Sequence, residues 1–364
     1  PASDQGQTFQ VGYDPRYTDA RGRVRDRPRP GLIGYRHPVG DKPKVLVVGA
    51  GAVGQVYGRH AALGGAEVTF FVREKYRSEV EKGFDMYPLN RRNRTEVVRF
   101  ESFTVVSRAD EVAATKFDQV YLTVSSSALA GPWLAELVAA AGDATILALQ
   151  PGQDDLDTIV AAGAARDRVV SGVITLISYH APLPGETRFP KPGMAYWFPP
   201  LSPSLVSGPA ERTAAVIAVL RAGRLPVKRH PDVPRFAAFP TAMMMPYLIG
   251  LESAGWTFRG LATGPIQLAA QGAREAMAIV ARTSGKPPLM MRVVARPRVL
   301  RMGLWFARRV VPLPLEIYLR EHFIKVGDQT RMFMAGYIAR GRAAGMPVTA
   351  LEQLSASVAT AAAA

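Results

Sequence analysis

The pattern of hydrophobic and polar positions changes abruptly at Lys44. Residues 1–43 are rich in Gly, Pro and Arg and lack an apolar period, whereas Val45–Val48 is a continuous apolar run. Such a run is typical of a strand buried on both faces of a parallel sheet. The stretch that ends at Leu63 has helical periodicity. Three further strands are predicted at residues 67–72, 117–124 and 144–149.

Predicted helices at residues 133–141 and 155–162 alternate with these strands, which indicates an α/β fold with a Rossmann-type, doubly wound parallel sheet. Further strands are expected between residues 169 and 206, and a helix at 210–222. Beyond Pro234, apolar segments at 241–254, 264–284 and 315–344 predict an all-helical C-terminal domain. We therefore divide the chain into a basic Pro/Gly-rich arm (1–43), a nucleotide-binding domain (44–230) and a helical substrate or dimerisation domain (231–364).

Composition excludes several classes of protein. The 364 residues contain no cysteine, which excludes disulfides, thiolate nucleophiles and cysteine-ligated metal sites. The sequence has no apolar run long enough to cross a membrane and no apparent signal peptide, so we expect a cytoplasmic protein. Lys and Arg exceed Asp and Glu by 45 to 30, giving a net charge of +15. Part of this excess lies in the arm, where Pro28 and Pro30 exclude a helix. The arm is either a phosphate- or partner-binding tail or a solvated extension.

A glycine-rich turn follows the first strand and opens the first helix. Its sequence is Gly49-Ala50-Gly51-Ala52-Val53-Gly54. In this context Gly49 permits a tight turn, Gly51 lets the backbone approach a pyrophosphate, and Gly54 allows close packing of helix on strand. The N–H groups at the start of the helix would bind the diphosphate. The turn predicts a dinucleotide cofactor.

The end of the second strand favours NADP over NAD. NAD-binding units commonly carry an acid there to accept a hydrogen bond from the ribose 2′-hydroxyl. This chain has Arg73, which can pair with a 2′-phosphate, and its first acid is Glu74. Lys75 and Arg77 are further candidates, or ordinary solvated side chains.

These motifs resemble the ketopantoate reductase family. The resemblance covers roughly residues 44–354 and rests on the glycine turn, Arg73, Gln150-Pro-Gly152 and the closing Gly336–Pro347 segment. It implies a Rossmann domain, a helical domain, and NADPH-dependent reduction of a 2-oxo acid in the cleft between them. Ser125 and Gly152 fall where the family contacts the nicotinamide end of the cofactor.

The chain departs from the family where the family carries its chemistry. Ser125 replaces a lysine, and Pro151 replaces an asparagine. The positions that align with the family's catalytic lysine and following asparagines are Ala238, Ala242 and Pro246. Because a carbonyl reductase needs a proton donor beside the developing alkoxide, another residue must supply it. We therefore expect a substrate other than ketopantoate.

Three residues of one segment are the candidate replacements. His322 and Lys325 are three residues apart and share a helix face, and Asp328 is placed to orient the lysine. Lys325 would bind a carboxylate or protonate an alkoxide. The other interpretation is a surface helix with ordinary ion pairs. His180, after Tyr179, is a second candidate, and Glu252 lies within an apolar helix where it faces either the cleft or a charged partner.

A basic apolar segment, residues 282–311, is the most unusual feature of the helical domain. Between residues 282 and 309 it holds eight cations and no acid, interleaved with apolar residues such as Trp305 and Phe306. This composition fits an interfacial membrane segment, a flap over an apolar or acidic substrate, or a helix pair packed inside the domain. Peripheral membrane contact and a homodimer both stay open. The five histidines are too scattered for a metal site, and no motif indicates nucleic-acid binding.

The expected function is an NADPH-dependent oxidoreductase that reduces an oxo or imine group of a small molecule. The alternative, motivated by the missing lysine and asparagines, is a non-catalytic NADP-binding protein that uses the basic apolar segment for a membrane or protein partner.

Overall fold

The computed structural model describes residues 16–18, 24–26 and 42–363, and the side chains of residues 42–358. Strand β1 (Arg16–Thr18) pairs antiparallel with β2 (Val24–Asp26) in a unit, Pro1–Gly40, distinct from the unit Asp41–Ala364. The rest of the predicted basic arm up to residue 41, including Pro28 and Pro30, lies outside the described residues.

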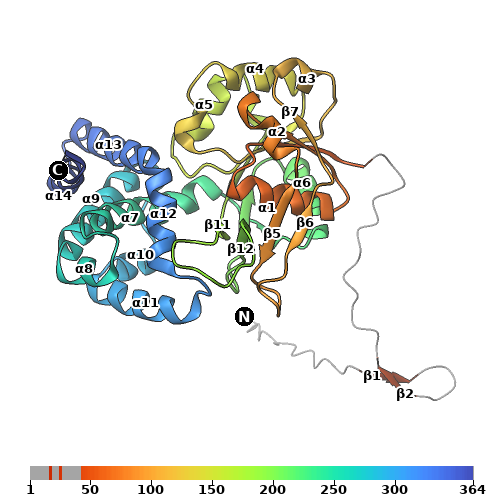
Figure 1. Cartoon of the computed structure of the whole chain (residues 1–364). Coiled ribbons are helices and arrows are strands. Elements are labelled where there is room, and N and C mark those ends of the chain that lie inside the picture. Colours follow the sequence, from red (N-terminus) through yellow and green to blue (C-terminus); the bar gives the residue numbers. More distant parts are fainter. Residues whose placement is uncertain (1–15, 19–23, 27–41, 364) are drawn as a thin grey trace, which may run out of the picture. The chain divides into compact units, whose positions relative to one another are not determined.

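An eight-stranded sheet forms the centre of the larger unit (Figure 1). Its order is β14 (Val227–Arg229), β13 (Ser204–Ser207), β10 (Val169–Val173), β9 (Thr145–Ala148), β8 (Gln119–Leu122), β3 (Lys44–Val48), β4 (Glu67–Phe71) and β7 (Thr104–Val106). The strands from β10 to β7 are all parallel, whereas β13 is antiparallel to β10. The predicted α/β fold with a doubly wound sheet is confirmed.

Helices cover both faces of this sheet, as the continuous apolar strands require. On one face Val45 and Val47 pack with α1 (Ala52–Leu63) and α6 (Ala210–Ala222). On the other, Leu46 and Val48 pack with α3 (Ala109–Ala113), α4 (Trp133–Ala140) and α5 (Asp155–Ala161). The alternation of neighbouring residues between the two faces follows from the two-residue period of a strand.

A second, four-stranded sheet was only partly predicted. Its order is β11 (Ile177–Ala181), β12 (Gly193–Trp197), β5 (Phe84–Pro88) and β6 (Val98–Phe100). Strands between residues 169 and 206 were expected, but β5, β6 and β7 were missed. Two of these have three residues each, and β5 pairs in parallel with β12, far along the chain, so local periodicity carries little signal for them.

The C-terminal region is helical. Its helices are α7 (Val233–Ser253), α8 (Phe258–Thr263), α9 (Ile266–Ser284), α10 (Leu289–Val294), α11 (Pro297–Val310), α12 (Leu315–Lys325), α13 (Gly327–Ala343) and α14 (Thr349–Ala363). Helix α7 begins earlier than predicted because the carboxylate of Asp232 caps it, accepting from the N–H of Arg235 at 3.0 Å, and Pro234 fits its first turn. The predicted helix 315–344 is two helices that meet at Val326.

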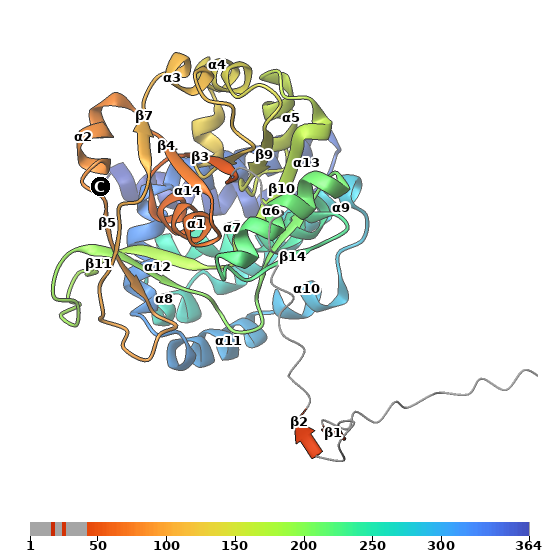
Figure 2. The ribbon, with the colours of Figure 1, turned by 90° about the vertical axis from the view of Figure 1, so that its right-hand side faces the viewer.

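Four short helices lie in the sheet region: η1 (Glu74–Tyr76), α2 (Arg77–Val80), η2 (Ser126–Leu129), which follows β8, and η3 (Arg166–Arg168). Helices α7, α9 and α14 pack together around the core of the helical region. This region meets the sheet region where α7 contacts β10 and β13, and where α13 contacts η2 (Figures 1 and 2). Of the helices that the structure describes, none is both long and apolar enough to cross a membrane.

Candidate functional site

The order of the large sheet reverses between β3 and β8. From β3 the chain proceeds to β4 and β7 on one side, and it then returns to β8, β9 and β10 on the other. In open α/β sheets, ligands bind in the crevice outside the carboxyl ends of the strands at this point. The turn after β3 and the loop after β8 therefore border the candidate site.

The turn after β3 has the geometry that its glycines predict. Gly49 has a φ of +95°, a left-handed conformation that favours glycine, and its N–H donates to the Phe71 carbonyl at 2.9 Å. A Cβ at Gly54 would collide with the Gly49 carbonyl oxygen and lie 2.7 Å from Thr123 Oγ1. A Cβ at Gly51 would meet no atom within 4 Å. Gly54 is thus required for packing, whereas Gly51 borders open space.

The N-terminus of α1 faces this open space. Gly51 is its N-cap residue, no side chain caps it, and its first turn, which includes Ala52 and Val53, contains no acid. The first N–H groups of a helix have no partner within the helix and carry a partial positive charge. The backbone N–H groups from Ala50 to Gly54 border the open space at Gly51, and this arrangement fits a pyrophosphate group.

Arg73 lies directly after β4 and is exposed. Its guanidinium donates to the Tyr76 hydroxyl at 3.2 Å and lies 5.0 Å from the centre of that ring; Lys75 Nζ lies 5.0 Å from the same ring. Among the described residues, no acid pairs with Arg73, because Glu74 lies 3.6 Å from Arg77 instead. Arg73 and Lys75 are the cations that can receive an anion here.

Arg77 is occupied by its own ion pairs. It lies 2.9 Å from Glu111 and 3.3 Å from Glu81, and the hydrogen bond with Glu111 is the main cause of its raised pKa. Of the three cations considered near the cofactor ribose, Arg77 is therefore a structural residue that fixes α2 against α3.

The loop after β8 is held by a buried carboxylate. Asp155 accepts from the Ser126 hydroxyl at 2.8 Å and from the N–H of Gly152. Burial raises the pKa of Asp155, and these two hydrogen bonds oppose that rise. The Gly152 amide is thus used inside the protein, and Gly152 shapes the loop because a Cβ there would lie 2.5 Å from the carboxylate. The Ser125 hydroxyl lies 3.1 Å from that of Ser127.

Gln150 fixes the end of β8 from the next strand. Its side-chain amide donates to the carbonyls of Leu122 and Val124, both at 2.9 Å, while its Oε1 is buried without a hydrogen-bond partner among the described residues. The sequence pattern around this glutamine indicates no role for it. It holds the loop that carries Ser125.

Helix α13 joins the same loop from the helical region. The side chain of Gln329 accepts from the backbone N–H of Ser126 at 2.8 Å. Asp328, the preceding residue, is exposed in the first turn of α13 and forms no ion pair with Lys325 within the described part of the chain. The predicted orientation of Lys325 by Asp328 is therefore not seen, because the break at Val326 places the two residues on separate helices.

The charge of Lys325 acts on two imidazoles, that of the exposed His180 in β11 and that of His322 in α12. The His322 ring stacks on Tyr318 with 5.5 Å between centres. Desolvation, and then the charge of Lys325, lower the pKa of His322; the same two causes, in the same order, lower that of His180, with Glu79 opposing. We call His180, His322 and Lys325 the basic cluster, because the charge of this lysine disfavours the protonated form of both imidazoles.

Tyr179, the neighbour of His180, has a structural role. It is buried, accepts a hydrogen bond from Arg188 at 2.9 Å, and packs its ring against Tyr318 with 5.9 Å between centres. Arg188 in turn lies 2.7 Å from Glu186. This network attaches α12 to the second sheet and so positions the cluster.

The first helix of the helical region offers no proton donor at the aligned positions. Ala238, Ala242 and Pro246 are all buried in α7. Glu252, near the end of the same helix, lies 2.7 Å from Arg331. The glutamate thus has a charged partner, which was one of its two expected roles.

The acids of the Asp154–Asp157 stretch each have a different partner. Asp154 lies 3.0 Å from Arg340, Asp157 lies 2.7 Å from Arg166, and Asp155 holds the loop described above. Across the described ranges, no group of side chains is suited to hold a metal ion. Sequence reasoning missed Ser126, Asp155 and Gln329, whose contacts join segments far apart in the chain.

Comparisons with known proteins agree with this geometry. Residues 45–202 match the family model for ketopantoate reductase PanE/ApbA. A ketopantoate reductase from Ralstonia eutropha JMP134 has a similar structure, with a TM-score of 0.65 and 20% identity over 86% of this chain and 96% of its own. A 2-dehydropantoate 2-reductase from Geobacter metallireducens GS-15 has a TM-score of 0.65 and 16% identity over 87% and 99%.

A D-mandelate dehydrogenase with NADH and anilino(oxo)acetate is also similar, with a TM-score of 0.59 and 13% identity over 87% of this chain and 97% of that one. No curated protein matches the sequence. Residues 45–202 thus match the ketopantoate reductase PanE/ApbA family model, and the chain has the fold seen in ketopantoate reductases.

Proposed function

We propose that the chain is an NADPH-dependent oxidoreductase that reduces an oxo or imine group of a small substrate other than ketopantoate. The observation that carries this proposal is the open space at Gly51, bordered by the N-terminus of α1 and placed where the sheet order reverses. A pyrophosphate is the anion that such a turn is built to bind.

The cations at the end of β4 support NADP rather than NAD. A 2′-phosphate would accept charge-assisted hydrogen bonds from Arg73, with Lys75 beside it. No carboxylate takes the place of these cations at the ribose, since Glu74 pairs with Arg77. Tyr76, between the two cations, offers an exposed ring for stacking of the adenine.

The basic cluster of His180, His322 and Lys325 is the proposed substrate end of the site. NADPH, when bound, supplies a hydride. Because desolvation and the charge of Lys325 lower the pKa of both histidines, Lys325 is the better proton donor to the developing alkoxide. The hydrogen bond between Ser126 and Gln329 supports this placement, since it attaches the segment after Lys325 to the loop beside the nicotinamide end.

The proposed substrate class follows from the polar groups that α7 lacks and from the charge of Lys325. The buried alanines of α7 offer no hydrogen bonds to a hydroxylated substrate, whereas Lys325 can bind a carboxylate. We therefore favour 2-oxo acids with apolar side chains. The similar D-mandelate dehydrogenase structure, which contains anilino(oxo)acetate, supports this class.

The proposal is tested first by binding and then by turnover. The protein is titrated with NADPH and with NADH, and NADPH oxidation is followed with ketopantoate and with a panel of aliphatic and aryl 2-oxo acids and cyclic imines. Tighter binding of NADPH and turnover of a substrate other than ketopantoate are the expected results. Equal affinities would overturn the assignment of NADP. NADPH binding with no turnover of any panel member would favour the non-catalytic alternative.

A further inference from the structure

Helix α11 has two apolar faces, and only one is covered. Leu300 and Leu304 pack on the core formed by α8 and α9. Met302, Phe306 and Val310, spaced four residues apart, form a second stripe and are 66%, 59% and 46% exposed. Because an unpartnered stripe of large apolar side chains is unfavourable in water, this face has the character of a binding surface.

Helix α10 extends the same surface. None of its residues is buried, nor is any residue of α11, and Leu289 and Met290 are 74% and 66% exposed. The expectation that this segment packs inside the domain is thus met only by its inner side, where Met291 of α10 and Leu300 and Leu304 of α11 pack on the core. We call the exposed side of α10 and α11 the outer surface; α11 lies at the lower end of the larger unit in Figures 1 and 2.

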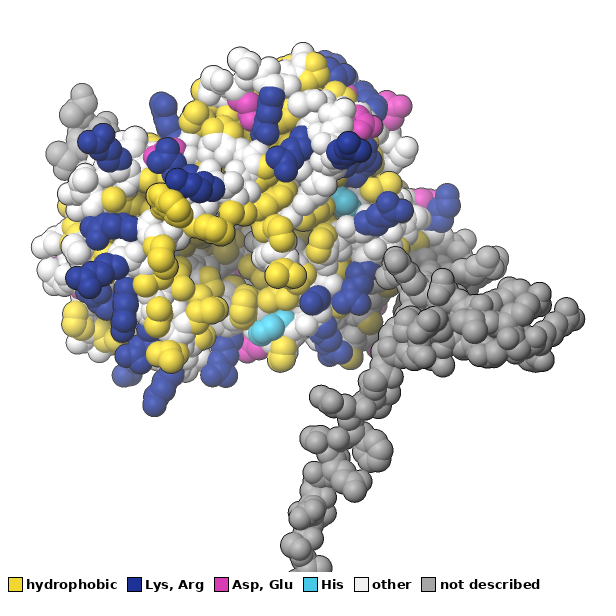
Figure 3. Space-filling view, turned by 90° about the horizontal axis from the view of Figure 1, so that it is seen from below, with side chains coloured by type: hydrophobic (Ala, Val, Ile, Leu, Met, Phe, Trp, Pro, Cys, Tyr) yellow, Lys and Arg dark blue, Asp and Glu magenta, His cyan; other side chains and the backbone are white. Residues whose placement is uncertain are grey.

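The charge of this surface has one sign. Residues 276–315 contain eight Lys and Arg and no acid. Figure 3, the view from below, shows hydrophobic side chains among many Lys and Arg side chains and few acidic ones. Arg292 and Arg298 are exposed and, among the described residues, have no carboxylate partner. A surface of this charge attracts anionic partners.

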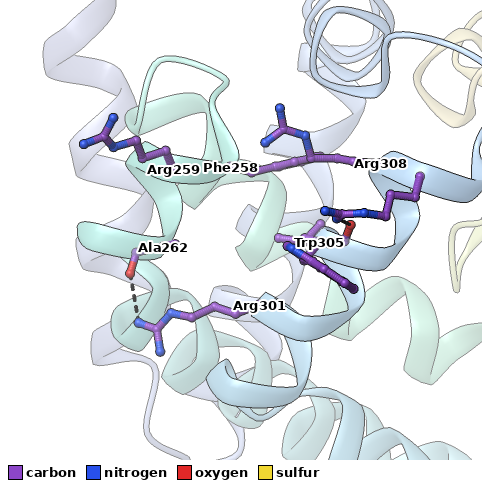
Figure 4. A pocket seen from close by; sticks show the side chains of 8 residues that line it. Phe258, Arg259, Ala262, Arg301, Trp305 and Arg308 are labelled. Atoms are coloured by element: carbon purple, nitrogen blue, oxygen red, sulfur yellow. Dashed lines mark hydrogen bonds between the residues drawn. The ribbon is translucent and has the colours of Figure 1, made fainter.

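A groove between α8 and α11 joins the apolar and basic features. It has a volume of about 690 Å³, and its lining includes Phe258, Leu304 and Trp305 with four arginines (Arg259, Arg301, Arg308, Arg309). Arg309 lies 3.6 Å over the Trp305 ring, and Arg301 donates to the Ala262 carbonyl at 2.8 Å (Figure 4). An apolar floor with arginines around it fits a phosphate headgroup with the start of an acyl chain.

We propose that the outer surface docks on a membrane that contains anionic phospholipids. Met302, Phe306 and Val310 enter the boundary between headgroups and acyl chains, the arginines contact lipid phosphates, and Trp305 lies at the interface. Docking is peripheral, since no described helix is suited to cross the bilayer. The charge complementarity favours an anionic lipid surface over a second copy of this basic chain, because two such surfaces would repel each other.

The test is sedimentation of the full chain with phosphatidylcholine vesicles, with and without phosphatidylglycerol. We expect binding only when phosphatidylglycerol is present, and a decrease in binding at high salt. Equal sedimentation with both kinds of vesicle, or none with either, would overturn the proposal.

Two pairs of variants locate the surface. The double variant Met302→Ser/Phe306→Ser should bind at least about tenfold more weakly, because two apolar side chains no longer enter the bilayer. Its conservative partner, Met302→Leu/Phe306→Leu, should bind as the wild type does. All four substitutions are at exposed positions, so the fold should tolerate them. Unchanged binding by the serine variant would contradict the proposal.

The charge of the surface is tested by Arg292→Glu/Arg298→Glu. Its affinity for phosphatidylglycerol vesicles should fall by at least about 30-fold. The matched control, Arg108→Glu/Lys116→Glu, makes the same change in net charge beside α3, at the opposite end of the molecule in both ribbon views, and should bind normally. Equal losses in both variants would mean that net charge alone drives binding. A second outcome would also contradict the proposal. If the wild type forms a dimer and binds no vesicles, and the serine variant is monomeric, the outer surface binds a second copy of the chain instead.

Discussion

The side chain of Gln329 accepts a hydrogen bond from the backbone N–H of Ser126 at 2.8 Å. The two residues belong to different parts of the chain: Ser126 begins η2 after β8, and Gln329 lies in the first turn of α13. Their bond fixes the segment that carries the basic cluster against the loop that borders the dinucleotide site. It links the sheet region to the helix that follows the candidate proton donor.

Gln329→Ala should loosen this link. The variant leaves a half-buried N–H without its acceptor, so the free energy of unfolding should fall by about 1 kcal/mol in urea denaturation. If the link also positions Lys325, kcat should fall while NADPH affinity stays the same. Gln329→Glu, which keeps an acceptor, serves as control. A lowered NADPH affinity with unchanged kcat would show that the bond serves the cofactor side instead.

Gly51 and Gly54 should respond differently to alanine. Gly54→Ala forces a Cβ onto the Gly49 carbonyl, so overpacking should lower the free energy of unfolding by about 1–3 kcal/mol. Gly51→Ala meets open space and should leave the melting temperature unchanged, yet weaken NADPH binding by about an order of magnitude. Thermal melts and fluorescence titrations of both variants decide the matter. Normal NADPH binding by Gly51→Ala would contradict a pyrophosphate at this position.

The sequence predicts the dinucleotide turn well because its signal is local. The strand, the three glycines and the helix lie within about 20 residues, and each glycine has a steric reason that holds in any such turn. Arg73 is found by the same reasoning, since it follows the next strand directly. The structure agrees with the steric roles at Gly49 and Gly54.

The rest of the site depends on contacts that leave no local pattern. Gln329 is one polar residue on a helix, and nothing in its neighbourhood indicates that Ser126 is its partner. The second sheet pairs β11 with β12, and Tyr179 of β11 packs against Tyr318 of α12. For α11, periodicity identifies the apolar positions, but only the packed structure reveals that Met302 and Phe306 remain uncovered.

Arg73→Glu should reverse the preference for NADPH. Loss of charge-assisted hydrogen bonds to the 2′-phosphate should weaken NADPH binding by about 10- to 100-fold. The new carboxylate can accept from a ribose 2′-hydroxyl, so NADH affinity should stay the same or improve. Lys228→Glu, an exposed charge reversal on β14, is the control. Calorimetric titration with both nucleotides measures the change, and an equal loss for NADPH and NADH would argue against a 2′-phosphate contact.

His60 should make the protein less stable at acid pH. Its ring is buried against Tyr196 and Phe198, Nδ1 lies 2.6 Å from the Gly223 carbonyl, and desolvation lowers its pKa from 6.5 to about 4. Between these two pH values the unfolded chain binds a proton that the folded chain does not. Stability should therefore fall as pH drops from about 6.5 to about 4, by up to about 3 kcal/mol from this residue.

The measurement is urea denaturation of the wild type and of His60→Gln across that range. The variant should lose less stability at acid pH than the wild type does, whatever its stability at neutral pH. NMR titration of His60 in the wild type gives the same information if the variant does not fold. Parallel pH profiles for the two proteins would refute the assignment.

Lys325→Ala should raise the pKa of both His180 and His322. Removal of the like charge favours the protonated imidazoles, although desolvation still holds both below their usual value. NMR titration of the two rings tests this without a substrate, with Lys75→Ala as control because Lys75 lies beside Tyr76. If Lys325 also donates the proton, kcat with the substrate found should fall by about 100-fold, and Lys325→Arg should not restore it, since a guanidinium retains its proton. If the pKa of both histidines rises but the variant is fully active, Lys325 is near both histidines but is not the proton donor.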